Sequence, residues 1–165
     1  MTRKSGGRRW RGHWQGASAG LLGVALLCAV PLVSAEVTLS DAWVRALPPT
    51  QRVTAAYVTL HNTGPAAVTV VGGHSELTSK LEVHRSVEDA GYVRMERVPA
   101  LAVAAGETVK LAPGGVHLML LDLQKMPAEG EVVNFCLALA DGSDQCTDAN
   151  VQRGPTGDTD HSRHH

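Results

Sequence analysis

The stretch Val53-Thr54-Ala55-Ala56-Tyr57-Val58-Thr59-Leu60 indicates the fold class of the chain. It is short and rich in β-branched and apolar residues, which is typical of a β-strand with a buried face. No window of the sequence has the sustained 3.6-residue apolar period of an amphipathic helix. Other short segments of the same character lie at residues 67–71, 80–87, 92–98, 108–111, 116–121 and 132–140.

Clusters of turn-forming residues separate these segments. They are Pro48-Pro49, Asn62-Thr63-Gly64-Pro65, Gly72-Gly73, Pro113-Gly114-Gly115 and Asp141-Gly142. Short strands in this number and at this spacing predict an all-β Greek-key sandwich or barrel. A chain of 165 residues is long enough for one domain with its own core, and we place that domain at residues 36–151.

The first 35 residues have the three parts of a secretory signal peptide. A basic, Gly-rich start precedes an apolar run at residues 17–33, and the small residues Ser34 and Ala35 follow. The run is shorter than the roughly 20 residues that span a membrane, and Pro31 interrupts it. We expect export to the periplasm, cleavage after Ala35 and no stable membrane insertion afterwards.

Two other export routes stay open in the same segment. Arg8-Arg9 suggests a twin-arginine signal, but the apolar residues expected after the pair are missing, so we favour Sec export. Cys28 suggests a lipoprotein, but Leu27 before it is larger than the usual small residue. We therefore read Cys28 as an ordinary residue of the apolar run.

Charge is unevenly distributed along the chain. Arg3, Lys4, Arg8, Arg9 and Arg11 are five of the fifteen Lys and Arg residues, and no acidic residue precedes Glu36. The chain from residue 36 onward has 10 basic against 16 acidic residues, a formal net charge of −6. A protein that neutralises phosphates has the opposite bias, so we expect no nucleic-acid partner.

Methionine is scarce, with four residues in the whole chain, and strand geometry predicts that two of them each pair with a histidine. The first pair is in the apolar segment His117-Leu118-Met119. In a strand, residues i and i+2 point to the same face. His117 and Met119 are therefore predicted to share one face, while Leu118 takes the other.

His84 and Met95 form a second pair if residues 80–87 and 92–98 make a hairpin. A loop of two or four residues centred between residues 89 and 90 would place His84 directly opposite Met95. A loop of odd length would offset the two. Where both pairs meet, the site contains two imidazoles and two thioethers and no carboxylate.

These ligand types favour one metal over others. Thioether sulfur binds Cu(I) far better than it binds hard cations, and imidazole binds copper in either oxidation state. Zinc is more typically held by Cys, His or carboxylate ligands. The alternative is that Met95 and Met119 fill gaps in the core and that the histidines are surface residues.

The spacing His84-x10-Met95-x21-His117-x-Met119 resembles the H-x10-M-x21-H-x-M signature of the periplasmic copper chaperone family PCu(A)C. The resemblance extends to other segments and covers roughly residues 40 to 140. These segments are 41–46 with Pro48-Pro49, 55–60 with Asn62-Thr63-Gly64, and 111–119.

The resemblance implies a monomeric, cupredoxin-like β-barrel that binds one Cu(I) through His84, Met95, His117 and Met119. It also implies delivery of copper for assembly of the CuA centre in subunit II of a haem-copper respiratory oxidase, alongside a Sco-type factor. No enzyme motif is present. The alternatives are copper storage or tolerance, electron transfer on the same fold, which needs a Cys thiolate ligand, and a β-sandwich module without metal.

Cys136 and Cys146 lie around the turn signal Asp141-Gly142. A three- or five-residue loop centred on Asp141 puts the two cysteines directly opposite each other, whereas a two-residue Asp-Gly turn pairs Cys146 with Leu137. In an exported protein we expect them to form a disulfide. A free dithiol that binds copper or reduces a partner is the alternative.

The last residues, 152–165, are polar and contain almost nothing to bury, so they are predicted to be disordered. They end in His161, His164 and His165. Clustered histidines on a mobile tail bind Cu(II) or Zn(II). We predict a secondary Cu(II) site there, and the alternative is a solvated chain end.

Overall fold

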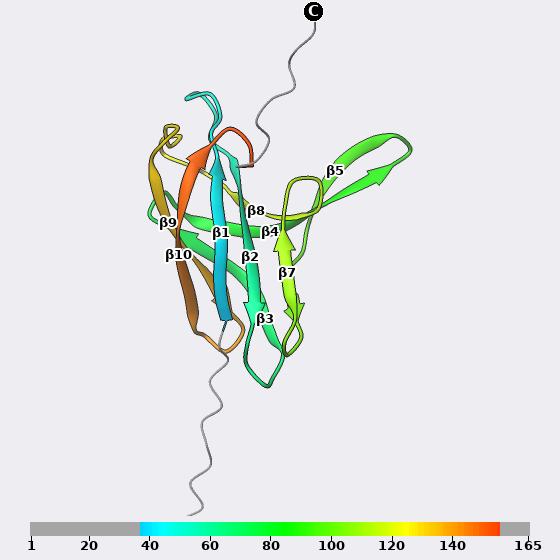
Figure 1. Ribbon diagram of the computed structural model, residues 1–165. Helices are drawn as coiled ribbons and strands as arrows, with labels where there is room; N and C mark the ends of the chain where they lie inside the picture. Colours follow the sequence, from blue (N-terminus) through cyan, green and yellow to red (C-terminus); the bar gives the residue numbers. More distant parts are fainter. Residues whose placement is uncertain (1–36, 156–165) are drawn as a thin grey trace, which may run out of the picture. The chain divides into compact units, whose positions relative to one another are not determined.

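The computed structural model describes residues 37–155, and all of its regular structure is β. None of the described residues forms a helix, and hence none forms one that could span a membrane. The strands are β1 (Val37–Arg45), β2 (Thr54–Asn62), β3 (Val68–Ser75), β4 (Thr78–Asp89), β5 (Tyr92–Arg97), β6 (Leu101–Val103), β7 (Thr108–Leu111), β8 (Val116–Leu120), β9 (Val132–Leu139) and β10 (Asp144–Gln152) (Figure 1).

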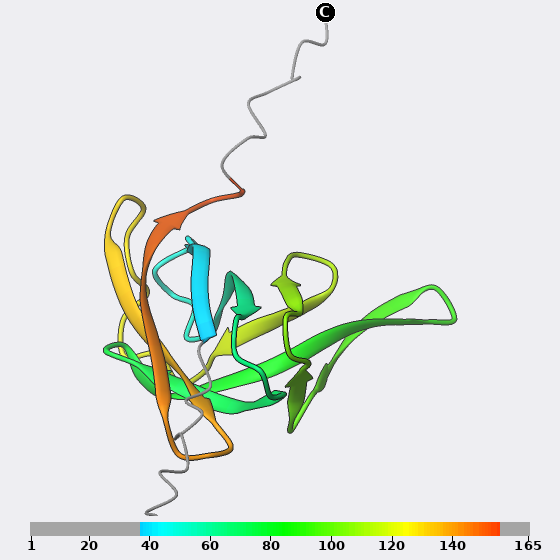
Figure 2. The ribbon, with the colours of Figure 1, turned by 60° about the horizontal axis from the view of Figure 1, so that its bottom comes forward.

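Seven of the strands close into a barrel in the order β4-β8-β2-β1-β10-β9-β3, because β3 also pairs with β4. Strand β5 extends the sheet beyond β4, β6 pairs with β3 and β7 pairs with β2. All pairings are antiparallel except that of β1 with β10. Figure 2 shows how the strands wrap around one interior. The prediction of an all-β barrel is confirmed.

The core lies inside the barrel and comes from alternate residues of each strand. Leu118 and Leu120 of β8 are fully buried, as are Phe135 and Leu137 of β9. They belong to one cluster with Val44 of β1 and apolar residues of β2, β3, β4 and β10. Each strand therefore has a second face that points outward, and side chains on that outer face are free to build a site.

The prediction missed β1, β6 and β10. Strand β6 has only three residues, and the other two each have a local reason. Asp41 has a φ of 52°, and the β1–β2 register shifts between Ser40 and Trp43, so an irregularity interrupts the alternation of β1. Strand β10 buries Ala149 and Val151 but exposes mostly polar residues on its other face. Because of that polar face, the sequence did not predict a strand here, although β10 pairs with both β1 and β9.

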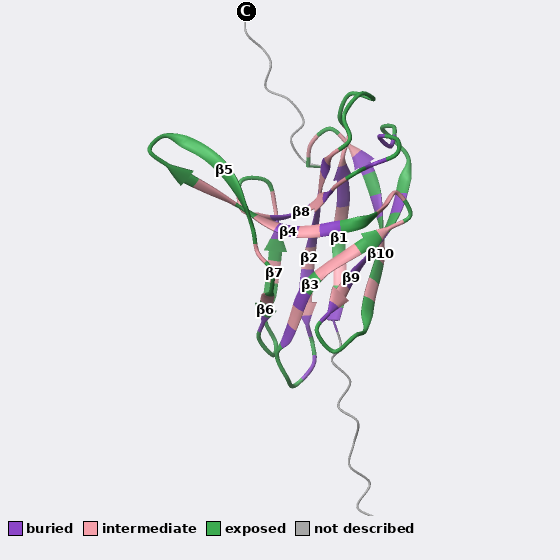
Figure 3. Ribbon diagram, turned by 180° about the vertical axis from the view of Figure 1, so that it is seen from behind, coloured by how far each residue is buried: buried purple, intermediate pink, exposed green. Residues whose placement is uncertain are grey.

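The β4–β5 hairpin projects from the barrel, and every residue of β5 is exposed (Figures 1 and 3). Its loop is the two-residue turn Ala90-Gly91, with φ of 50° and 83°, between the paired residues Asp89 and Tyr92. Positive φ at both positions suits the right-handed twist of a hairpin and favours Gly at the second position. The loop is thus centred one residue later than predicted.

The predicted signal peptide, residues 1–35, lies outside the described residues. The histidines of the predicted tail site, His161, His164 and His165, lie outside them as well. The predicted tail, residues 152–165, begins one residue too early, because Gln152 is the last residue of β10.

Candidate metal centre

The outer face of β8 carries the first predicted pair. Leu118 and Leu120 point into the core, so His117 and Met119 share the opposite face, as the alternation predicts. His117 is only 2% exposed, although it lies outside the core. Neighbouring groups on the outer face, described below, cover it.

The hairpin brings the second pair together in a different way from the prediction. His84 lies opposite Arg97, and Met95 lies opposite Ser86, so the direct pairing of His84 with Met95 is wrong. Because the turn is centred one residue later, the residue opposite each position of β4 lies two positions later on β5 than predicted. A shift of two keeps the side-chain face, so Met95 still lies on the face of His84, in a diagonal position.

The two pairs meet because β4 and β8 are neighbours. His84 is directly opposite His117 in the β4–β8 ladder, and the ring centroids are 6.3 Å apart. His117, Met119 and Met95 line one cavity of about 220 Å³. Of these three, Met95 is exposed over 58% of its surface. His84 is not among the residues that line this cavity, and it adjoins the other three through its pairing with His117.

Each histidine has one ring nitrogen engaged and one unpartnered. Nδ1 of His117 is 2.9 Å from the carbonyl oxygen of Gly115, and Nε2 of His84 is 2.9 Å from Oε2 of Glu82. A carbonyl and a carboxylate accept hydrogen bonds only, so these nitrogens carry the protons. The other two, Nε2 of His117 and Nδ1 of His84, are buried without a hydrogen-bond partner. Their lone pairs are free to bind a metal.

Glu82 is a residue of the site that sequence reasoning missed. Its Oε1 also forms an ion pair with Nε of Arg97 at 3.4 Å, and Arg97 is opposite His84 on β5. Arg97 and His84 therefore both contact the carboxylate of Glu82, and the carboxylate fixes the orientation of the His84 imidazole. Carboxylates in this position orient ligating histidines and raise their basicity. The spacing Glu82-x-His84 on one strand face was the signal that could have revealed it.

An aromatic layer flanks the other side of His117. Trp43 and Tyr57 have ring centroids 4.3 Å apart, and the Tyr57 ring lies 6.5 Å from that of His117. The guanidinium carbon of Arg45 is 5.6 Å from the centre of the Tyr57 ring. Burial raises the pKa of the Tyr57 phenol, and Arg45 offsets part of that rise, so the phenol is neutral at pH 7.

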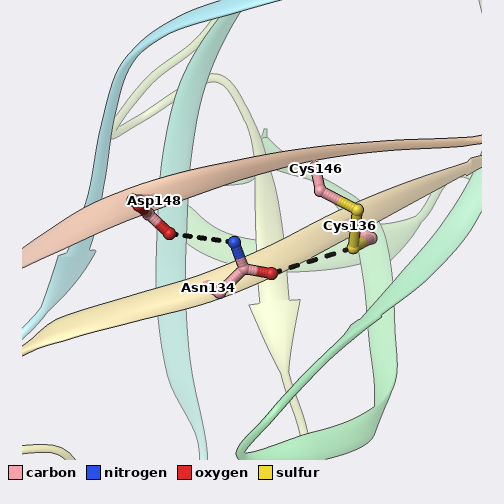
Figure 4. Close-up of a disulfide and its surroundings, with 4 residues drawn as sticks. All are labelled: Asn134, Cys136, Cys146 and Asp148. Atoms are coloured by element: carbon pink, nitrogen blue, oxygen red, sulfur yellow. Dashed lines mark hydrogen bonds between the residues drawn. A yellow bond between two sulfur atoms is a disulfide. The ribbon is translucent and has the colours of Figure 1, made fainter.

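The two cysteines form a disulfide on a different part of the barrel (Figure 4). Cys136 of β9 is directly opposite Cys146 of β10. The amide of Leu139 donates to the carbonyl oxygen of Ser143 at 2.8 Å, which closes a three-residue loop centred on Asp141. The predicted disulfide is confirmed. Neither strand pairs with β4 or β8.

The disulfide also limits the ligands that residues 37–155 can provide for a metal. Both cysteines of this range are bonded to each other, so no thiolate is available for a blue-copper site. The described residues contain no cluster of three or more His, Cys, Asp or Glu that could hold a metal. The sulfur that this part of the chain offers a metal is therefore methionine thioether.

Comparisons with known proteins agree with this fold. Residues 37–151 match the family model LpqE-like, whose description names a lipoprotein. A protein of Leifsonia xyli subsp. xyli, named lipoprotein Lxx21020, is 36% identical over 108 residues. That match covers 65% of this chain and 64% of the relative, so the chain spans less than two thirds of the relative's length.

Solved structures of the same fold include copper domains. The Cu(I) form of DR1885 from Deinococcus radiodurans is 32% identical, with a TM-score of 0.57 over 78% of this chain and 83% of that one. The copper-bound PCuAC domain from PmoF2 has a TM-score of 0.60 at 22% identity, covering 72% of this chain and 95% of that domain.

Proposed function

Because this chain belongs to the LpqE-like family, we propose that it is a copper chaperone with a single Cu(I) site. The proposed ligands are His84, Met95, His117 and Met119. Support comes from DR1885, a relative above 30% identity whose structure contains Cu(I). Binding and release of a metal require no catalytic group, and we propose no enzymatic activity.

The observation that carries the proposal is the pair of buried, unpartnered nitrogens. Nε2 of His117 and Nδ1 of His84 have no hydrogen-bond partner, on residues that face each other across two strands. A buried polar atom without a partner costs about 1–3 kcal/mol. A metal ion bound to both removes that cost. Two thioethers beside them make Cu(I) the preferred metal.

A competitive titration tests this proposal. The chain from Glu36 is titrated with Cu(I) against a chromophoric chelator, and one tight site is expected. His117→Ala and Met119→Ala should weaken binding at least about tenfold, because each removes a ligand. His74→Ala is the matched control, since His74 is exposed on β3. Unchanged affinity in both ligand variants would reject the site.

We further propose that the copper is delivered to the CuA centre in subunit II of a haem-copper oxidase, with a Sco-type factor in the same route. The exposure of Met95 supports transfer, because a recipient can reach the metal from that side. The alternative is copper storage or tolerance. Transfer from the loaded chain to the copper-free soluble domain of subunit II, followed by absorption of the CuA centre, separates the two. Retention of all copper would favour storage.

We propose that the protein acts in the periplasm. The LpqE-like family and the Leifsonia relative are named lipoproteins, which supports export. The sequence offers release after Ala35 or lipid attachment at Cys28, and we retain release because Leu27 precedes Cys28. Mass spectrometry of the exported chain decides: an N-terminus at Glu36 supports release, and a lipid-modified Cys28 contradicts it.

A further inference from the structure

We propose that Arg45 and Gln152 form a binding subsite for a small anion, such as a carboxylate, next to the metal cavity. The subsite would hold the anionic ligand by which an exchange partner gives or takes copper. Only that second part rests on the proposed function. The anion site itself is argued from side chains that the metal centre does not use.

The two residues are neighbours although they are far apart in the sequence. Arg45 ends β1 and pairs with Gln152 in the parallel β1–β10 ladder. The amide of Ala46 donates to the carbonyl oxygen of Gln152 at 2.8 Å, which fixes the register. Val44 and Val151 are buried in the core, so both side chains lie on the outer face of the barrel.

Both side chains hold a buried donor without a partner. These donors are Nε of Arg45 and Nε2 of Gln152. An unpartnered buried donor is costly, and two of them on directly paired residues indicate a place for an acceptor. A carboxylate accepts hydrogen bonds only, and guanidinium groups bind it in a fixed fork geometry. A carboxylate has two oxygen atoms, one for each of these donors.

The charge of Arg45 is also unbalanced. Among residues 37–155 it has no ion pair, and none of the described residues that line the metal cavity is acidic. The phenol of Tyr57 beneath it is neutral, as described above. Glu82 is engaged with His84 and Arg97 on the other side of the centre. No described acidic side chain therefore neutralises this guanidinium.

Copper in the cavity would increase the attraction for an anion. Arg45 lines the cavity together with Met95, His117 and Met119. A monovalent copper ion there adds a second positive charge near the first, and the two repel each other. An anion bound at Arg45 interacts favourably with both. An incoming ligand with a carboxylate is therefore drawn to the edge of the cavity where it can contact the metal.

A titration of the copper-free chain with acetate tests the subsite directly. We expect saturable shifts of the Arg45 Nε–H and Gln152 side-chain amide resonances in NMR spectra. Arg45→Gln should abolish saturation. Arg52→Gln is the matched control, because the Arg52 guanidinium donates to the carbonyls of Leu123 and Gln124 at 2.9 and 2.8 Å. Shifts that never saturate, or that persist in Arg45→Gln, would overturn the subsite.

A second variant keeps the guanidinium and fills the site. Gln152→Glu places a carboxylate beside Arg45 within the chain, so it should prevent acetate binding while the Arg45 Nε–H resonance remains visible. This variant decides the question if Arg45→Gln does not fold. Full acetate binding in Gln152→Glu would contradict the assigned location.

The role in exchange is tested by removing Cu(I) with two chelators of different charge. Bicinchoninate carries carboxylates, whereas neocuproine is neutral. Both Arg45→Gln and Gln152→Glu should slow removal by bicinchoninate about fivefold or more, with no change for neocuproine, because only the anion is attracted. Equal effects on both chelators would reject this role. A chain that binds no copper would reject the proposed function, while the acetate titration would still decide the subsite.

Discussion

His84 lies directly opposite His117 across the β4–β8 ladder, and the unprotonated nitrogen of each ring is buried and unpartnered. The protonated nitrogens have fixed acceptors, the carboxylate of Glu82 and the carbonyl oxygen of Gly115. Both tautomers are therefore set before any metal arrives. The proposed centre is preorganised on the barrel strands β4 and β8, and only Met95 comes from β5.

Glu82→Gln should weaken Cu(I) binding by about tenfold or more, the effect typical of losing a carboxylate behind a ligating histidine. The amide oxygen can still accept the proton of His84, but the negative charge that raises ligand basicity is gone. Competitive Cu(I) titration measures the effect. The control is Glu96→Gln, an exposed residue of β5 that pairs with Arg94. Equal affinities in both variants would show that Glu82 has no part in the centre.

Leucine replacements should separate metal binding from packing. Leu and Met have similar volumes, and such exchanges usually change the free energy of unfolding by less than about 1.5 kcal/mol. Met95→Leu and Met119→Leu should therefore lose Cu(I) affinity with little loss of stability. Met126→Leu is the control, because Met126 is 4% exposed in the core. Urea unfolding and Cu(I) competition measure the two properties. A loss of affinity in Met126→Leu equal to that of the other variants would contradict the assignment.

Removal of the disulfide should destabilise the barrel and spare the metal centre. The bridge joins residues separated by 10 positions, and the loop-entropy relation gives about 2–3 kcal/mol for a loop of this size. The variant with Ala at both Cys136 and Cys146 should show this loss in urea unfolding. Its Cu(I) affinity should equal that of the parent, because β9 and β10 do not pair with β4 or β8. A lost copper site would mean that the two regions are coupled.

Stability should fall at high pH because of Tyr57. Burial raises the pKa of its phenol above the ordinary value of 10.0. Above pH 10 the unfolded chain loses this proton while the folded chain retains it, so the folded state loses stability until the folded pKa is passed. Thermal unfolding between pH 8 and about pH 11 measures the slope. Tyr57→Phe should flatten it, whereas Tyr92→Phe, which changes an exposed tyrosine, should not.

The sequence allows some of these features to be predicted and conceals others. The shared face of His117 and Met119 follows from the two-residue period of a strand, which is a local rule. The partner of Met95 depends on where the turn is centred, and a change of one residue replaces the expected His84 with Ser86. Met95 nevertheless lies on the predicted face, because a shift of two positions returns a side chain to the same face.

Other features could not be predicted because they depend on the fold. Arg45 and Gln152 meet only through the parallel β1–β10 pairing. The sequence marks neither strand, because β1 is interrupted at Asp41 and β10 consists mostly of polar residues. Gly115, whose carbonyl oxygen holds His117, lies in a turn that the sequence marks only as a break. Hydrogen-bond partners of this kind follow from the three-dimensional path of the backbone rather than from residue type.

The parallel pairing of β1 with β10 also gives the barrel a polarity. Val37 begins β1 at one end, whereas Arg45 and Gln152 finish β1 and β10 together at the other end, beside the metal cavity. The proposed metal site therefore lies at the end of the barrel opposite to the start of β1, separated from Val37 by the whole length of that strand.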